Sequence, residues 1–177
     1  MEQNQFINIV NDYKDLIYNQ AYYFTNNKQD AEDITQDVLV KLWHNFSTLK
    51  KRFVKSWIIK VTRNTCIDFS RKKKENVPAI HDNNEEEIPF GESLIDLRPN
   101  PEQKAISNDI NENITKLIGR LPDKMRSIII MKDVQDLKYD FIAETMDLPL
   151  NSVKVYIHRG RKLLLKYFLS HFKNELE

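Results

Sequence analysis

The chain has 177 residues, of which 41% are hydrophobic and 30% charged, with four histidines and a single cysteine. This hydrophobic content suffices for compact cores and excludes a wholly disordered chain. One cysteine excludes a disulfide framework and a cysteine-based metal set, and the histidines lack metal-ligand spacing, so we expect no metal and no cofactor. No run of about 18 apolar residues could cross a bilayer and the N-terminus has no leader pattern, so we expect a cytoplasmic protein without membrane insertion.

The net charge of +1 hides an uneven distribution along the chain. Residues 1–74 carry +5, residues 75–102 carry −7 and residues 103–177 carry +3. Two basic segments separated by an acidic one suit a protein that binds polyanions in two places.

Residues 1–74 predict an all-helical lobe with helices at about 4–26, 30–47 and 52–74, because neither glycine nor proline interrupts them. Apolar residues at helical spacing predict a buried stripe on the second helix, formed by Ala31, Ile34, Val38, Leu42 and Phe46. The other face of this helix is mixed and, taken alone, indicates only solvated surface. We expect Cys66 and Trp57 of the third helix to fill the core.

The third helix divides its residues more sharply. Its apolar side consists of Ile58, Val61, Thr65 and Phe69. Another side combines cations with a short amide and consists of Lys60, Arg63, Asn64, Ile67, Arg71 and Lys74. Such a row suits contacts to nucleic-acid phosphates and base edges, although a solvated basic face is the alternative.

Residues 75–102 predict a flexible acidic linker between two lobes, because they hold four of the six prolines and show no sustained periodicity. A solvated tether is the simplest interpretation. The alternative is that the acidic run occupies a basic channel in a partner or shields basic faces when DNA is absent.

Residues 103–177 predict a second all-helical domain that contains a helix-turn-helix within residues 139–163. Pro149 interrupts two helical patterns, and we expect Asn151 to cap the second helix. Val153 and Ile157 would pack inward. The outward arc, which could enter a major groove, consists of Lys154, Val155, His158, Arg161 and Lys162. An ordinary helical hairpin with a solvated basic face is the alternative for this segment alone.

Four motifs in order resemble those of extracytoplasmic-function (ECF) sigma factors. Residues 30–43 resemble the AED-x-x-Q-E-x-x-x-x-x-W signature, and residues 56–71 resemble the W-L…R-N-x-x-x-D…R helix. Residues 121–126 resemble the L-P-x-x-x-R start of the second domain, and the helix-turn-helix follows where the family has one. The resemblance covers both lobes and implies a protein that is not an enzyme. It would bind core RNA polymerase and promoter DNA, direct promoter-specific initiation, and be held by an anti-sigma factor.

The resemblance also implies three groups of site residues. Those expected to bind polymerase are Asp33, Gln36, Asp37 and Trp43. Those expected to bind the minus-ten element as the duplex opens are Lys60, Arg63, Asn64 and Arg71. Those expected to bind the minus-thirty-five element as duplex are Ser152, Lys154, Val155, His158, Arg159 and Arg161.

Two departures from the family pattern stand out. Val155-Tyr156 follows Lys154 where members often have Ser-Arg, so the promoter sequence does not carry over from relatives. Gly160 replaces a common alanine, at an expected cost of about 1 kcal/mol of helix stability.

Two other classes of protein compete with this interpretation. One is a conventional DNA-binding regulator whose N-terminal lobe senses a ligand or dimerises. The other is an interaction module, such as an anti-sigma-like adaptor, that binds polymerase or a sigma factor but no DNA. An enzyme has the least support, because no Ser/His/Asp, Cys/His or phosphate-loop set is present. The sequence is equally compatible with lobes that pack together and lobes that lie apart.

Overall fold

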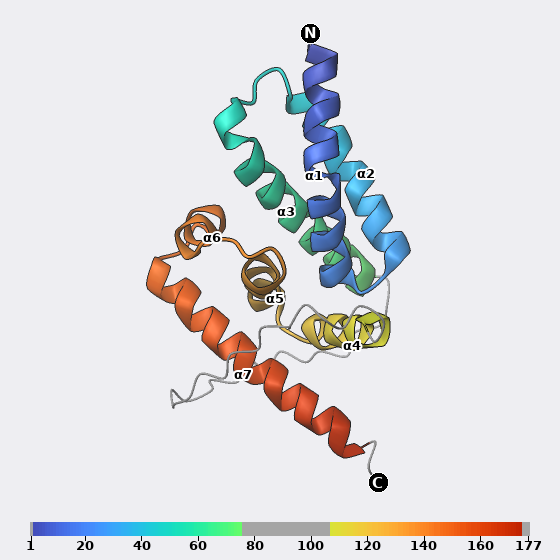
Figure 1. The fold of residues 1–177 in the computed structure, drawn as a ribbon, viewed down its shortest axis with the longest axis vertical. Helices are drawn as coiled ribbons and strands as arrows, with labels where there is room; N and C mark the ends of the chain where they lie inside the picture. The colour runs from blue at the N-terminus through green and yellow to red at the C-terminus, as the bar shows by residue number, and fades with distance from the viewer. Residues whose placement is uncertain (1, 76–106, 175–177) are drawn as a thin grey trace.

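The computed structural model describes residues 2–75 and 107–174, and within these ranges the chain is helical with no strand. Nearly all of the segment predicted to be a linker lies outside the described residues. The described helices form two groups, one before and one after this segment (Figure 1). The prediction of an all-α protein with two small helical domains is confirmed.

The N-terminal lobe is a bundle of α1 (Glu2–Thr25), α2 (Lys28–Asn45) and α3 (Val54–Glu75), with the short 3₁₀ helix η1 (Lys51–Phe53) before α3. Asn26 allows the sharp turn after α1, because its left-handed backbone (φ 53°) is one that asparagine tolerates. Asn27 then caps α2, its side-chain oxygen accepting a hydrogen bond from the Asp30 amide at 3.0 Å. The three predicted helices are therefore present, with bounds shifted by about two residues.

The core of this lobe follows the predicted stripe. Ala31, Ile34, Val38 and Leu42 are at most 1% exposed, whereas Phe46 lies just beyond α2 and is half-buried. Cys66 is fully buried, as predicted. Trp57 is partly buried and packs against the same core, so the predicted core role of both residues is confirmed.

The C-terminal lobe contains α4 (Ser107–Gly119), α5 (Asp123–Ile129), the π-helical turn η2 (Ile130–Val134), α6 (Tyr139–Met146) and α7 (Leu150–Asn174). In Figure 1 α7 runs under the other helices of this lobe, and its C-terminal part projects beyond them. Its N-terminal part packs against α6 and α5, which places it in the helix-turn-helix.

The predicted helix-turn-helix is formed by α6 and the start of α7. Asp147 ends α6 in the left-handed conformation (φ 52°, ψ 48°), and the Leu148 amide donates to the Ala143 carbonyl at 3.0 Å. Val153 and Ile157 are buried, as expected. The predicted cap is wrong, because α7 already begins at Leu150 and Asn151 lies within its first turn.

The two lobes pack against each other. The sequence alone was compatible both with packed lobes and with separate lobes. Ile118, Leu121, Met125, Ile129 and Ile130 of the C-terminal lobe belong to the same buried cluster as the core of α1, α2 and α3. Ile59 of α3 is fully buried and packs among the core residues of the helix-turn-helix. The described part of the molecule therefore has a core that is continuous between the lobes.

Arg126 joins the lobes through backbone carbonyls. Its guanidinium donates to the carbonyls of Phe24 (3.1 Å), Gly119 (2.6 Å) and Leu121 (2.9 Å), and it lies 4.7 Å from the centre of the Phe24 ring. Phe24 and Gly119 are at or near the C-terminal ends of α1 and α4, where helix carbonyls lack intrahelical partners and a positive charge is favoured. The last residue of the L-P-x-x-x-R motif thus holds two helix ends together.

Candidate polymerase-binding and DNA-binding surfaces

The four residues predicted to bind polymerase lie on the exposed side of α2. Asp33, Gln36 and Asp37 are exposed and occupy about one helical turn, while the buried stripe points the other way. Trp43 lies near the end of the same helix and is 53% exposed. The structure thus places these residues on the exposed side of one helix, with the aromatic residue about two to three turns beyond the carboxylates.

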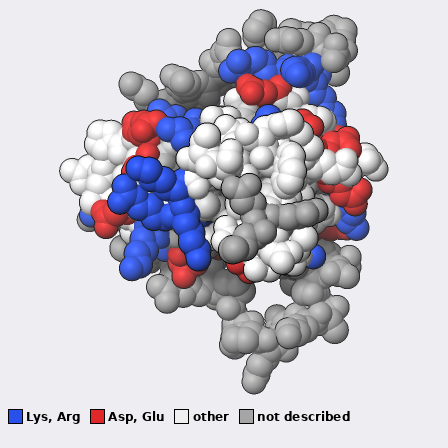
Figure 2. All heavy atoms as spheres, turned by 90° about the horizontal axis from the view of Figure 1, so that it is seen from above, with Lys and Arg blue, Asp and Glu red and all other residues white. Residues whose placement is uncertain are grey.

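Trp43 belongs to an exposed apolar region at the end of the lobe where α1 begins. Its ring meets the Phe6 ring edge-on at 4.8 Å, and Phe6 in turn meets Phe46 at 5.5 Å. Val40 and Ile7 are also about half exposed. Seen from this end, a broad surface with few charges lies beside a gathering of Lys and Arg side chains (Figure 2). Large exposed apolar side chains beside charged ones are typical of a protein-binding surface.

The row predicted to bind the minus-ten element lies along α3. Lys60, Asn64 and Arg71 are exposed and Arg63 is half-buried, while Ile58, Thr62 and Cys66 point into the core. The structure therefore brings the four residues onto one side of a single helix, as their spacing predicts. Among the described residues, the buried Nε of Arg63 has no hydrogen-bond partner.

Of the residues predicted to read the minus-thirty-five element, Lys154 is exposed. The other five are half-buried: Ser152, Val155, His158, Arg159 and Arg161. Arg161 is engaged inside its own lobe, donating to Asp133 through Nε (3.2 Å) and Nη2 (2.5 Å). For Arg161 to contact a DNA phosphate, its guanidinium would therefore have to leave the Asp133 carboxylate.

The structure adds one residue that sequence reasoning missed. The Asp147 carboxylate lies 2.9 Å from the Lys60 ammonium, although the two residues are 87 positions apart. No local pattern signals this contact, because it depends on how the lobes dock. The Lys60 hydrogen bond and charge, with a further contribution from the Arg63 charge, hold the pKa of Asp147 below its ordinary value.

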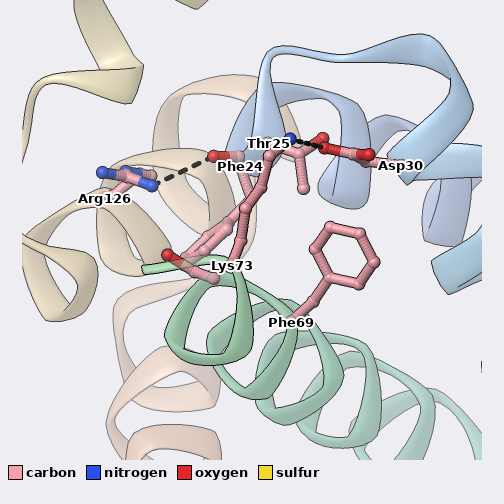
Figure 3. Close-up of a pocket in the computed structure, with 7 residues that line it drawn as sticks. Phe24, Thr25, Asp30, Phe69, Lys73 and Arg126 are labelled. Atoms are coloured by element: carbon pink, nitrogen blue, oxygen red, sulfur yellow. Dashed lines mark hydrogen bonds and ion pairs between the residues drawn. The ribbon is translucent and has the colours of Figure 1, made fainter. Parts of the chain in front are cut away.

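A pocket of about 360 Å³ lies where α1, α2, α3 and α5 meet (Figure 3). Its lining includes Phe24, Phe69, Asp30, Lys73 and Arg126. Lys73 reaches across it to Asp30 at 2.8 Å, and Arg126 is bonded to the Phe24 carbonyl. Both cations thus already have partners, and none of the predicted site residues lines this pocket.

Two further classes of site find no support in the part of the chain that the structure describes. No helix there is long and apolar enough to cross a membrane. Within the same residues, no three His, Cys, Asp or Glu side chains are grouped as a metal ion would need.

An all-helical chain with a basic row on α3 and a helix-turn-helix with exposed cations is a DNA-binding protein of the helix-turn-helix class. Comparison with known proteins narrows this class. The family described as "Sigma-70 region 2" matches residues 9–76, and "Sigma-70, region 4" matches residues 111–164.

Individual relatives agree with these matches. The chain is 32% identical to the ECF RNA polymerase sigma factor SigW of Bacillus subtilis, over 93% of this chain and 89% of the relative. It is 30% identical to the RNA polymerase sigma factor SigV of the same organism, over 89% of this chain and 87% of the relative. The sigma factor RpoE of Bartonella quintana, solved with the anti-sigma factor NepR, has the same fold with a TM-score of 0.68. That likeness covers 92% of this chain and 95% of RpoE at 18% identity.

The chain belongs to the ECF sigma factors. These are transcription initiation factors of RNA polymerase, and the protein functions in promoter-specific initiation.

Proposed function

We propose that the two lobes divide promoter recognition between them. The N-terminal lobe takes hold of one strand of the minus-ten element as the duplex opens, and the helix-turn-helix reads the minus-thirty-five element as duplex. The observation that carries this proposal is the row of Lys60, Arg63, Asn64 and Arg71 on a side of α3 opposite its core residues. Cations in such a row suit backbone phosphates, and a short amide suits base edges.

Asn64 is the residue of this row that we assign to a base. It is exposed, and its side chain offers both a donor and an acceptor. An unpaired base presents its Watson–Crick edge to such a group, whereas in the duplex the partner base occupies that edge. Lys60, Arg63 and Arg71 would hold the backbone of the same strand.

We assign the reading of the minus-thirty-five element to the first turns of α7, because the N-terminal part of a recognition helix meets base edges in the major groove. Exposed Lys154 would donate to guanine acceptors, and Val155 would contact a thymine methyl group. The remaining predicted contacts, which we assign to bases or phosphates, are Ser152, His158, Arg159 and Arg161.

We assign polymerase binding to the exposed face of α2. Asp33, Gln36 and Asp37 supply polar groups, and Trp43 supplies an exposed ring of the kind that dominates many protein interfaces. The protein performs no catalysis of its own in this scheme, and it acts in the cytoplasm, where its polymerase is. We also propose an anti-sigma factor as a partner, because the similar RpoE was solved with one.

The test is transcription in vitro with core RNA polymerase on a genomic DNA library, with and without this protein, followed by mapping of new start sites. New starts that share upstream motifs at two fixed offsets are the expected result, and they would supply the promoter sequence. Duplex binding without new starts would favour a conventional regulator. Polymerase binding without DNA binding would favour an adaptor.

A further inference from the structure

The turn of the helix-turn-helix docks onto the basic row of α3. Asp147 ends α6, and its carboxylate meets the Lys60 ammonium at 2.9 Å. The Asp147 side chain is 78% exposed and the Lys60 side chain 46% exposed, so the pair lies at the surface of the boundary between the lobes. A carboxylate from one lobe thus engages a cation that the proposed function assigns to DNA in the other.

Arg63 lies close enough to Asp147 to act on it. Its positive charge adds to that of Lys60 in stabilising the ionised carboxylate. Arg63 is half-buried, and among the described residues its Nε has no hydrogen-bond partner. The carboxylate is therefore hydrogen-bonded to one cation of the row and stabilised by the charge of a second, and a backbone phosphate would be attracted to the same two charges.

Apolar packing holds the carboxylate in this place. Ile59, next to Lys60, is fully buried. It packs in the same cluster as Ile128, Ile142 and Val153 of the C-terminal lobe. One turn earlier, the Lys55 ammonium lies 5.9 Å from the centre of the Phe141 ring of α6. This end of α3 is therefore a contact surface for the C-terminal lobe, and a DNA strand that binds Lys60 must displace the Asp147 carboxylate from it.

The masking is confined to one end of the row. Arg71 lies eleven residues beyond Lys60, which is about 16 Å along a helix, and it remains exposed together with Asn64. Lys154 of the recognition helix is also exposed in the docked arrangement. Docking of the lobes therefore covers part of the surface for single-stranded DNA and leaves a cation available for duplex DNA.

We propose that Asp147 competes, inside the molecule, with the phosphates of the promoter strand for Lys60 and Arg63. The protein then holds its own minus-ten surface partly closed, and strand capture requires α6 to leave α3. This inference rests on the proposed role of α3 and adds a means of regulation to it. A partner or a solution condition that favours the docked lobes would lower strand capture more than duplex binding.

The test compares the variants Asp147→Asn and Asp136→Asn. Asn keeps the size of the side chain and tolerates the left-handed backbone, so Asp147→Asn removes the charge and spares the turn. Asp136 is a matched control, because its backbone is also left-handed (φ 47°) and its carboxylate pairs with Lys132 of its own lobe. Both variants lower the negative charge of the C-terminal lobe equally.

Binding is measured by fluorescence anisotropy with a labelled 20-nucleotide single strand of mixed sequence and with a 20-base-pair duplex. We expect Asp147→Asn to bind the single strand about two- to fivefold more tightly than the wild type, the range set by an exposed ion pair. The duplex affinity of this variant, and both affinities of Asp136→Asn, should match the wild type. In a Lys60→Met background the gain from Asp147→Asn should shrink, because the main partner of the carboxylate is gone.

Three results would overturn the inference. Equal single-strand affinities for the two variants would show that Asp147 does not compete with DNA. An equal gain on single strand and duplex would show only a general effect of charge. If the wild type still initiates transcription with core polymerase in either case, the proposed function stands. If neither the wild type nor Asp147→Asn binds the single strand and no transcription starts, the proposed role of α3 fails and the inference fails with it.

Discussion

Gly160 and Ile129 mark a close approach between α7 and α5. A Cβ atom at Gly160 would lie 2.7 Å from Cγ1 and 2.8 Å from Cδ1 of the fully buried Ile129. The absence of a side chain at Gly160 therefore lets the two helices pack closely. The expected cost of this glycine was based on helix propensity alone, and it did not include the packing of α7 against α5.

The Gly160→Ala variant should be less stable than the wild type by about 1 kcal/mol. Alanine adds about 1 kcal/mol of helix propensity, but crowding in a packed core costs about 1–3 kcal/mol. Urea unfolding measures the difference. In an Ile129→Ala background the two closest contacts are absent and only Met125 Cγ at 3.1 Å remains, so there the same substitution should be less destabilising than in the wild type. A gain in stability in the wild-type background would contradict this account.

The Arg126→Met variant should lose about 3 kcal/mol of unfolding free energy, because carbonyls of both lobes would lose a charged donor in a buried setting. Arg120 is the control, since it is an exposed arginine in the connection between α4 and α5. Arg120→Met should change stability by no more than about 0.5 kcal/mol. Denaturant unfolding of both variants decides the matter, and equal losses would mean that the Arg126 hydrogen bonds contribute nothing.

The Trp43→Ala variant should weaken binding to core polymerase about tenfold or more, as expected for an exposed aromatic residue at the centre of an interface. Its stability should fall by only about 1 kcal/mol, because Trp43 is already 53% exposed and its edge contact with the Phe6 ring is a modest one. Ile114→Ala is the control, since Ile114 is 42% exposed in the other lobe. Titration of labelled polymerase without DNA gives both affinities, and a Trp43→Ala affinity equal to the control would remove Trp43 from the interface.

The Arg71→Ala variant should bind single-stranded DNA less tightly and with a shallower dependence on salt. Loss of one phosphate contact reduces the slope of log K against log salt by about 0.7 for a single strand. Lys14→Ala is the matched control, because Lys14 is an exposed cation on α1. Anisotropy titrations at several salt concentrations measure the slopes. Identical slopes for the two variants would place Arg71 outside the DNA surface.

The Cys66 thiol should resist alkylation in the folded protein at neutral pH and react once the protein unfolds. Burial, the main cause, raises the pKa of Cys66 from 9.0 to about 12. The folded protein therefore keeps this proton at pH values where the unfolded chain releases it. Rapid reaction of the native protein with iodoacetamide at pH 8 would show that Cys66 is accessible.

The same pKa shift predicts a loss of stability at high pH. Between the unfolded value of 9.0 and the folded value of about 12, the unfolded chain binds fewer protons, so unfolding becomes easier as pH rises. The slope from this group is about 1.4 kcal/mol per pH unit inside that window, and the contribution is fully present below pH 9. Urea unfolding of wild type and Cys66→Ala at pH 8 to 10.5 isolates it, since the variant should lack this slope.

The sequence by itself determined the helices, the inward stripe of α2, the side of α3 that carries the basic row, and the helix-turn-helix. These features follow from the spacing of residues that are close in the chain. Helical periodicity assigns Ala31 and Val38 to the buried face of α2, and Asn64 to the exposed face of α3, however the lobes are arranged. The start of α7 was missed by two residues, since Pro149 and Asn151 both favour a boundary there.

Only the tertiary structure decided what Ile59, Arg126, Asp147 and Gly160 do. Each acts through residues that are distant in the sequence: Ile59 through the core of the other lobe, Arg126 through the end of α1, Asp147 through Lys60, and Gly160 through Ile129. Local propensity carries no record of such pairs, because their energies arise when two helices are already formed and packed. The helices of this sigma factor are therefore determined by residues close together in the chain. The packing of its two lobes is determined by contacts between residues that are far apart in the chain.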